Sequence, residues 1–248
     1  MKLTFLGTGH GIGTSERACS CMLLQTGRSL YLIDGGVDIG VRLRSAGYDP
    51  RDVKAIFTTH AHSDHIGGIY QFIDLFNWAK DLSECRLEVF FTEVSVARAM
   101  ENLVSLTTKP LDRKRILLKE AGEGSVYSDE NIKVTYFPTK HLAPLGRPSY
   151  GILIECEGKR VYFSGDLSQH LTGEDFPALP TMLPVDMFVL ELAHFGVEHI
   201  ENLLPGVLCK KLAFNHVSPL KKYEEIEALK GKYRYEILTP SDMDSVEI

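Results

Sequence analysis

The sequence predicts an α/β protein in which two β-sheets are sandwiched between layers of helices. Short β-rich segments recur along the 248 residues, and helical patterns lie between some of them. With 44% apolar residues, the chain can bury one sizeable core. No Pro/Gly/Ser-rich linker and no internal repeat divides it. We therefore expect a single domain over residues 1–248.

One set of segments is rich in β-branched, aromatic and other apolar residues and ends in small or polar residues, as strands do. These segments are residues 2–6, 22–26, 29–34, 53–59, 86–92, 132–138, 150–156, 160–165, 186–192 and 210–215. A second set has apolar residues at helical spacing. These segments are residues 37–47, 65–82, 94–105, 198–206 and 220–232. We expect hairpins among the early strands and helices interspersed throughout.

Composition excludes several functional classes. The amino-terminal stretch MKLTFLGTG is too short for the apolar part of a signal peptide, and no later stretch approaches a membrane span. The five cysteines are odd in number and mostly far apart, which fits reduced thiols and a cytoplasmic protein. A net charge of −6 disfavours a broad nucleic-acid surface. We interpret the basic run at residues 113–119 as a solvated face, although it could touch phosphates locally.

Chemically active side chains follow the ends of the predicted strands. Those at or just beyond strand carboxyl ends are Asp34, His60, His62, His141, Asp166, His194 and His216. In layered α/β proteins, functional loops gather at that edge. Histidines scattered through a core would not follow the strand ends, so the sequence predicts a functional site there.

The segment FTTHAHSDHIGG is the strongest local signal. In an extended loop, His60, His62 and Asp64 project to the same side, and His65 turns away as the next helix begins. Four nitrogen and oxygen ligands at this spacing can hold two nearby cations. The two glycines that follow allow the helix start to approach the site closely. The alternative is a polar loop whose histidines bond to backbone, but this pattern rarely arises by accident.

Two metals need further protein ligands. His141 would complete a three-histidine site that leaves one position open for water. Asp166 can bridge both ions, because a carboxylate has two oxygens. His216 would join Asp64 and His65 at the second ion. Taken alone, His141 and His216 are each equally compatible with an ordinary loop histidine.

The motif THAHSDH, followed by a lone histidine, an SGD aspartate and a late strand-end histidine, resembles the metallo-β-lactamase superfamily over nearly the whole chain. FLGTG, then Arg17, then LIDGG is similar to its ribonuclease Z and phosphodiesterase branch. The resemblance implies a four-layer αββα sandwich with a dinuclear metal centre between the sheets. It implies that His60, His62 and His141 bind the first metal and that Asp64, His65 and His216 bind the second. Asp166 would bridge the two metals.

The resemblance also assigns two supporting residues. Asp34 matches an aspartate that hydrogen-bonds the ligand-bearing loop, although a simple turn aspartate is the alternative. His194 matches a histidine that contacts the scissile phosphate and the leaving group. This chain has phenylalanine after it, where the branch has serine or threonine, and either His194 or His199 could instead be a surface residue. His10 and His170 are unassigned loop histidines.

Together these features predict a metal-dependent hydrolase, and specifically a phosphodiesterase that uses a hydroxide bridging two divalent metal ions. Asp64 and His194 are the expected catalytic residues, with His194 protonating the departing oxygen. The ligands suit zinc, with manganese or iron as alternatives. We expect a small-molecule or nucleotide phosphodiester as substrate, no membrane partner, and compatibility with a homodimer.

Three alternatives remain. A ribonuclease Z-like tRNA 3′-processing endonuclease is disfavoured, because the resemblance implies a long RNA-binding arm between His141 and Asp166, where the sequence predicts only a hairpin. An arm elsewhere, between Ile69 and Ile132, would keep RNA open as a substrate. A lactamase or thioesterase type of acyl hydrolase would not need His194. A non-catalytic metal-binding protein is the third alternative.

Overall fold

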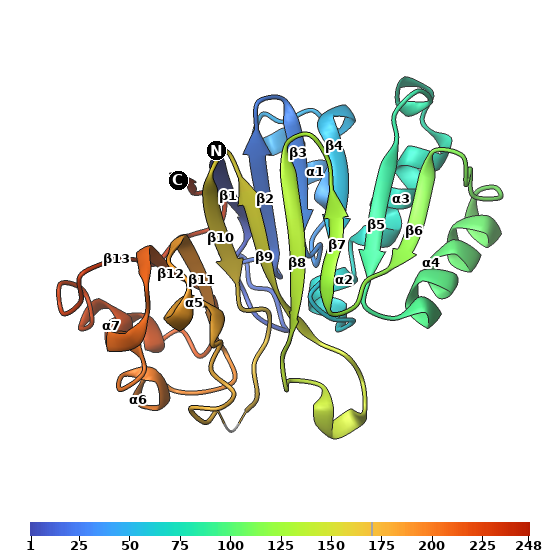
Figure 1. Cartoon of the computed structure of the whole chain (residues 1–248). Coiled ribbons are helices and arrows are strands. Elements are labelled where there is room, and N and C mark those ends of the chain that lie inside the picture. Colours follow the sequence, from blue (N-terminus) through green and yellow to red (C-terminus); the bar gives the residue numbers. More distant parts are fainter. Residues whose placement is uncertain (170) are drawn as a thin grey trace.

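In the computed structural model, residues 1–169 and 171–248 are described, and they form two seven-stranded sheets (Figure 1). In spatial order, the first sheet contains β14 (Ser245–Glu247), β1 (Lys2–Gly7), β2 (Cys21–Thr26), β3 (Ser29–Ile33), β4 (Val53–Phe57), β5 (Leu87–Phe91) and β6 (Ile116–Glu120). The second contains β13 (Glu236–Leu238), β12 (Cys209–Val217), β11 (Val185–Leu192), β10 (Lys159–Phe163), β9 (Tyr150–Cys156), β8 (Ile132–Pro138) and β7 (Gly124–Ser128).

Helices lie outside both sheets (Figure 1). The α-helices are α1 (Ile39–Ser45), α2 (Ser63–Ile66), α3 (Ile69–Trp78), α4 (Val94–Thr107), α5 (Leu179–Met182), α6 (Val197–Ile200) and α7 (Lys222–Glu227). The short 3-10 turns are η1 (Pro50–Asp52), η2 (Lys80–Leu82), η3 (Ala143–Leu145) and η4 (Leu204–Gly206). This arrangement confirms the predicted αββα sandwich. Within the described residues, no helix has the length and apolarity needed to cross a membrane.

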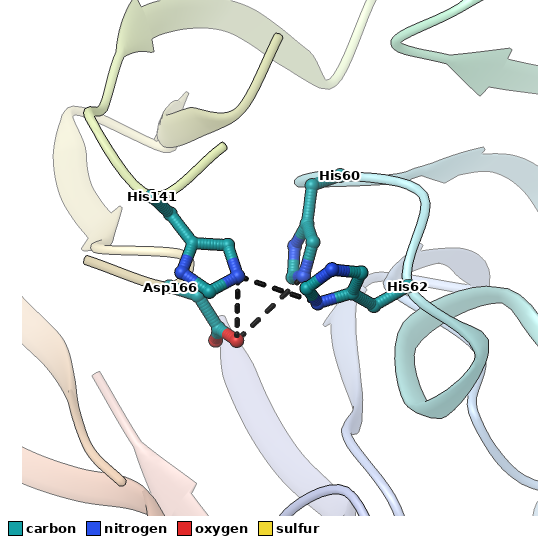
Figure 2. Close-up of side chains that lie close together, drawn as sticks. All are labelled: His60, His62, His141 and Asp166. Carbon is teal, nitrogen blue, oxygen red and sulfur yellow. Dashed lines mark hydrogen bonds and ion pairs between the residues drawn. The ribbon is translucent and has the colours of Figure 1, made fainter. Parts of the chain in front are cut away.

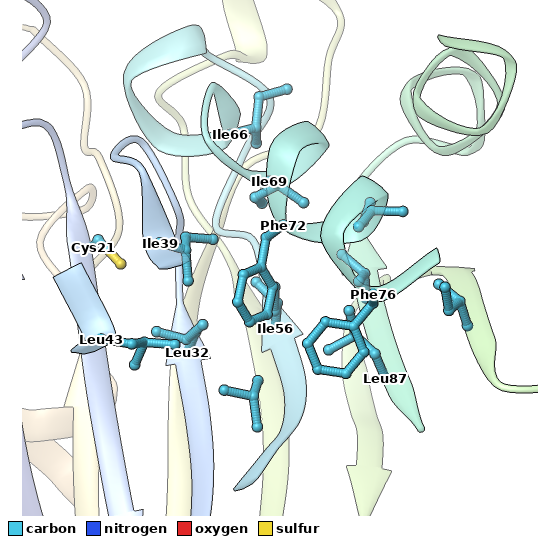
Figure 3. Close-up of a cluster of buried hydrophobic side chains, with 14 of the residues drawn as sticks. Cys21, Leu32, Ile39, Leu43, Ile56, Ile66, Ile69, Phe72, Phe76 and Leu87 are labelled. Carbon is cyan, nitrogen blue, oxygen red and sulfur yellow. The ribbon is translucent and has the colours of Figure 1, made fainter. Parts of the chain in front are cut away.

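Strict side-chain alternation along the strands produces three apolar layers. On β3, Leu30 and Leu32 face the helices, whereas Tyr31 and Ile33 face the other sheet. Phe72 of α3 belongs to the layer between the first sheet and α1, α3 and α4 (Figure 3). A middle layer joins the two sheets, and a third packs α6 and α7 on the second sheet. Burial of both faces of each sheet leaves the strand ends as the place for polar chemistry.

Three expected helices are wrong in extent, and the one expected over residues 220–232 is reduced to α7. The helix expected over residues 65–82 is broken, because the Gly68 N–H donates to the Gly35 carbonyl at 2.8 Å instead of continuing α2. The glycines there do allow close approach: a Cβ on Gly68 would lie 1.5 Å from the Val37 carbonyl oxygen. The helix expected over residues 198–206 is reduced to α6 and η4, because the Leu203 N–H donates to the Ile200 carbonyl at 2.7 Å and the α-helical bonding pattern stops there.

Four short strands, β6, β7, β13 and β14, are absent from the sequence prediction. β6 lies in the basic run at residues 113–119, so the interpretation of that run as a solvated face is wrong in part. Ile116 is buried, and the Arg115 guanidinium donates to backbone carbonyls, among them that of Phe76 at 2.7 Å. Arg113 and Lys114 do remain exposed. The cysteines are free thiols, as expected.

Candidate metal centre

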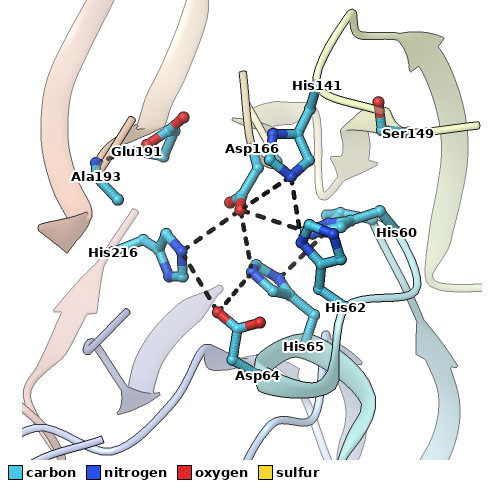
Figure 4. A network of polar contacts seen from close by, with 12 residues as sticks. His60, His62, Asp64, His65, His141, Ser149, Asp166, Glu191, Ala193 and His216 are labelled. Atoms are coloured by element: carbon cyan, nitrogen blue, oxygen red, sulfur yellow. Dashed lines mark hydrogen bonds and ion pairs between the residues drawn. The ribbon is translucent and has the colours of Figure 1, made fainter. Parts of the chain in front are cut away.

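One carboxylate oxygen lies at the centre of a cluster of imidazoles contributed by both sheets (Figure 4). From Asp166 Oδ2, the distances to the Nε2 atoms are 3.4 Å for His65, 3.5 Å for His216, 3.6 Å for His60, and 3.8 Å for His141 and His194. Asp166 itself is buried and follows the end of β10. The predicted strand-end residues are therefore brought together at one place.

The potential ligand atoms of the described residues form three groups, each with its atoms within 4.8 Å of one another, and the third, Asp166, Glu191 and His194, shares Asp166 with the first. The first group is His60, His62, His141 and Asp166 (Figure 2). The second is Asp64, His65 and His216. Because Asp166 Oδ2 is also close to His65 and His216, it joins the groups in the position expected of a bridge.

The local geometry of the histidine loop differs in part from the expectation. His60 and His62 precede α2 in extended backbone, but Asp64 and His65 belong to the helical turn that begins at Ser63. The N–H of His65 donates to the His62 carbonyl at 3.0 Å, which closes that turn. An extended projection of Asp64 alongside the two histidines is therefore wrong, although its carboxylate still reaches the second group.

Four of the imidazoles that point Nε2 toward Asp166 are held by a hydrogen bond at Nδ1. The Nδ1 partners are Thr59 Oγ1 for His60 (3.1 Å), Asp34 Oδ2 for His65 (2.7 Å), Leu167 O for His141 (3.1 Å) and Gly9 O for His216 (3.1 Å). These acceptors favour the proton on Nδ1 and leave the Nε2 lone pair directed at the cluster. His62 instead presents Nδ1, which lies 3.3 Å from His141 Nε2.

The hydrogen bonding of two ring nitrogens indicates whether these residues fit a metal. His60 Nε2 and His65 Nε2 are buried and have no hydrogen-bond partner in the described part of the chain. An unsatisfied buried polar atom is destabilising by about 1–3 kcal/mol. Both atoms face the carboxylate of Asp166, where a cation would satisfy them. Imidazoles and carboxylates are the donors that divalent transition metals accept, so the cluster fits a divalent metal site.

Burial determines the charge state of the first group. Loss of hydration lowers the pKa of His60 well below its ordinary value, with the neighbouring His65 acting in the same direction. Burial also lowers the pKa values of His62 and His141. These imidazoles are therefore neutral near pH 7, which is the form that binds metals.

The second group has the opposite balance. Burial would lower the pKa of His65, but the carboxylates of Asp166 and Asp34 outweigh it and raise this pKa well above the ordinary value. Burial would raise the pKa of Asp166, but His216, His65 and His60 hold it well below the ordinary range. A bound cation would take the place of the proton on His65, so metal binding at this group releases protons.

Asp34 lies where the sequence predicts it, directly after β3, and it is buried with a positive φ of 60°. Its carboxylate accepts from Thr59 N at 2.8 Å, from Thr59 Oγ1 at 2.9 Å and from His65 Nδ1 at 2.7 Å. The first bond fixes the start of the histidine loop, and the last fixes a ring within it. A turn aspartate would not need the bond to His65.

His194 follows β11 and has a partner that sequence reasoning missed. Its Nδ1 lies 2.9 Å from Oε1 of the buried Glu191, which also accepts from the N–H groups of Leu167 and Ala193. Burial would lower the pKa of His194, but the hydrogen bond and charge of Glu191 raise it. A glutamate in the otherwise apolar strand end LELAH was the available sequence signal.

Lys222 of α7 was also missed. Its buried ammonium donates to the carbonyls of Leu192 at 2.9 Å, Ala193 at 3.2 Å and Phe195 at 2.6 Å. These carbonyls flank His194 on both sides. Lys222 therefore holds the loop that carries His194.

The remaining histidines differ in their distance from the centre. His10, unassigned from the sequence, has its ring centroid 5.3 Å from that of His216 and 6.2 Å from that of His194. His199 is on α6 and pairs with Glu198. His170 lies outside the described residues.

Arg17 is engaged in contacts within the protein. Its Nη1 atom donates to Thr8 Oγ1 at 2.7 Å and to the Pro240 carbonyl at 2.9 Å, and the guanidinium lies over the Tyr223 ring. Arg17 thus ties the loop after β1 to the carboxyl-terminal part of the chain.

Comparison with known proteins is consistent with this geometry. A model of the family described as Anti-Pycsar protein Apyc1 matches residues 1–176. Ribonuclease Z of Methanocaldococcus jannaschii is 30% identical over 162 residues, a match that covers 62% of this chain and 47% of the relative. The chain thus spans about half the length of that relative.

Two solved structures share the fold. Human tRNase Z, short form, superposes with a TM-score of 0.76 at 19% identity, covering 100% of this chain and 99% of the other. The metallo-β-lactamase fold protein YhfI from Bacillus subtilis has a TM-score of 0.76 at 18% identity, covering 99% and 98% of the two chains.

Metal content tests the central position of Asp166. We expect purified protein to hold about two equivalents of transition metal, as two-metal sites do. Asp166→Ala should lose most of this metal, because it removes the oxygen shared by both groups, whereas His194→Ala should retain it. Elemental analysis of the purified variants measures the difference. Equal metal content in wild type and Asp166→Ala would contradict the assignment.

Metal affinity tests the support from Asp34. Asp34→Asn keeps the shape but loses the charge that orients His65, so metal affinity should weaken by about 10- to 100-fold. Competition with a chelator measures this affinity. Asp38→Asn is the matched control, because Asp38 caps α1 through Val41 N and lies outside the ligand groups of the described residues. An unchanged affinity in Asp34→Asn would leave Asp34 with a turn role alone.

Proposed function

We propose that this chain is a dinuclear metal-dependent phosphodiesterase. The chain belongs to the family described as Anti-Pycsar protein Apyc1, within the metallo-β-lactamase superfamily. The ribonuclease Z and phosphodiesterase branch of that superfamily matches its motifs and fold. The observation that carries the proposal is the position of Asp166 Oδ2, between the two ligand groups and beside His194.

The proposed ligand sets follow the two groups. His60, His62 and His141 would hold the first cation; Asp64, His65 and His216 would hold the second; Asp166 would contact both. Zinc suits this set, with manganese and iron as alternatives. Asp64 and Asp166 neutralise only part of the charge of two divalent cations. The set of two cations and their protein ligands would therefore keep a positive charge, which favours an anionic phosphodiester over a neutral ester.

When bound, two divalent cations would lower the pKa of a water molecule between them and polarise the phosphoryl group. Asp64 is suited to orient the attacking water. Burial would raise the pKa of Asp64, but His65 and His216 lower it, so the carboxylate is ionised at neutral pH. The Gly11 N–H donates to Asp64 Oδ2 at 2.9 Å and holds this carboxylate in place.

His194 supplies the proton for the leaving group. Its Nε2 faces the cluster, while Glu191 holds Nδ1 and raises the pKa, so a larger fraction of the ring is protonated near neutral pH. As the water oxygen forms its bond to phosphorus, the bond to the leaving oxygen breaks. That oxygen takes the proton from His194, as in general acid catalysis. Lys222 keeps the ring in reach by fixing its loop.

The segments that could have formed an RNA-binding arm are part of the fold, which favours a small substrate over RNA. Residues 141–166 contain η3, β9 and β10, and residues 69–132 contain α3, η2, β5, α4, β6 and β7. These segments belong to the sandwich and its short connections rather than to an extended arm. We therefore propose a small or nucleotide-type phosphodiester, such as a cyclic nucleotide, with pre-tRNA as the competing substrate.

A substrate panel tests the reaction class. Metal-loaded protein should hydrolyse bis(p-nitrophenyl) phosphate and a cyclic nucleotide, and should leave nitrocefin, an acyl thioester and pre-tRNA intact. Initial rates measured beside those of Asp166→Ala exclude contaminating activity. Faster turnover of nitrocefin or the thioester would favour an acyl hydrolase. Cleavage of pre-tRNA at its 3′ end would favour the ribonuclease.

Leaving-group dependence tests His194. His194→Ala should keep its metal yet lose on the order of 10²–10⁴-fold in turnover of a nucleoside phosphodiester, because the departing alkoxide needs a proton. The loss should shrink with p-nitrophenyl esters, whose phenolate departs unprotonated. His199→Ala is the matched control, since His199 lies on α6 outside both ligand groups. Equal losses for both leaving groups would indicate that His194 only positions substrate.

A further inference from the structure

The loop between β1 and β2 places the imidazole of His10 beside the cluster. His10 belongs to none of the ligand groups found among the described residues. His10 is half-buried, with its ring 5.3 Å from that of His216 and 6.2 Å from that of His194, measured between centroids. Within the described part of the chain, its ring makes no hydrogen bond or ion pair with another protein group. A partly exposed imidazole with free nitrogens beside a catalytic centre is available to a ligand.

The backbone on each side of His10 is fixed to the second ligand group. The Gly9 carbonyl accepts from His216 Nδ1 at 3.1 Å, and the Gly11 N–H donates to Asp64 Oδ2 at 2.9 Å. The Gly9 N–H also donates to the Ala18 carbonyl at 2.7 Å, which closes the loop. The backbone on both sides of residue 10 is therefore tied to the proposed ligands of the second group.

The spacing of His10 and His194 suits a phosphoryl group. A hydrogen bond from a ring N–H to an oxygen is about 3 Å long. With the ring centroids 6.2 Å apart, one phosphoryl group between the rings can present one oxygen to each of them. His194 is already committed to the leaving oxygen in the proposed reaction, so His10 is free to contact an oxygen that does not depart.

We infer that His10 is a substrate-binding residue whose ring N–H donates to a non-bridging phosphoryl oxygen of the bound phosphodiester. This inference rests on the proposed phosphodiesterase function. It gives the loop after β1 a direct part in recognition: Gly9 and Gly11 support the ligands, and His10 between them contacts the anion.

Phosphate binding and metal content test this role without relying on turnover alone. Metal-loaded His10→Ala should hold as much metal as wild type and bind inorganic phosphate about 10-fold more weakly, as loss of a hydrogen bond to an anion implies. His10→Gln should recover part of the affinity, because its amide keeps an N–H donor. His199→Ala is again the matched control. Calorimetric titration measures the affinity, and KM for bis(p-nitrophenyl) phosphate should rise in parallel.

The outcomes separate this inference from the proposed function. Loss of metal in His10→Ala would make His10 a ligand and overturn the inference, as would unchanged phosphate affinity. Wild-type hydrolysis of phosphodiesters with unchanged His10 variants would overturn the inference and leave the function standing. Weaker phosphate binding in His10→Ala without any wild-type hydrolysis would leave the anion site standing and overturn the function. If His10→Ala does not fold, His10→Phe, which has no N–H donor, takes its place. A phosphate affinity of His10→Phe equal to that of His199→Ala would then overturn the inference.

Discussion

Asp166 carries a buried negative charge at the junction of the two sheets, and imidazoles from both sheets surround one of its oxygens. An uncompensated charge in such a place would destabilise the fold by roughly 3–5 kcal/mol. The loops after β4, β8 and β11, together with the end of β12, must therefore converge on this carboxylate. The same convergence assembles the proposed metal ligands, so stability and function depend on one arrangement of charge.

A layer of fixed contacts outside the cluster determines how its members point. Asp34 and Thr59 orient rings in the histidine loop, Glu191 orients His194, and Lys222 holds the loop around it. These supporting groups are themselves largely buried, which removes competing water and strengthens their hydrogen bonds. The site is therefore preorganised by the packing of the sandwich, and flexible side chains do not have to search for the productive geometry.

The sandwich and its substrate chemistry are separable. Proteins with distinct names share this fold at less than 20% identity, so the fold alone does not select a substrate. In this chain, the residues that we propose to contact the substrate lie on loops at the strand ends: His194 after β11 and His10 after β1. Loops at this edge can change without disturbing the apolar layers. In the proposed function, the scaffold holds the metal ligands and the surrounding loops select the anion.

The sequence by itself determined the elements whose signals are local. Short runs of β-branched, aromatic and other apolar residues revealed the central strands, and the spacing of FTTHAHSDHIGG revealed the histidine loop and its chemistry. Tertiary structure alone decided what depends on distant partners. β6, β7, β13 and β14 are short edge strands with weak patterns of their own, and the break before α3 follows from a hydrogen bond to Gly35. Likewise, Lys222 and His10 acquire roles only because folding places them against residues far away in sequence, and no local periodicity records such contacts.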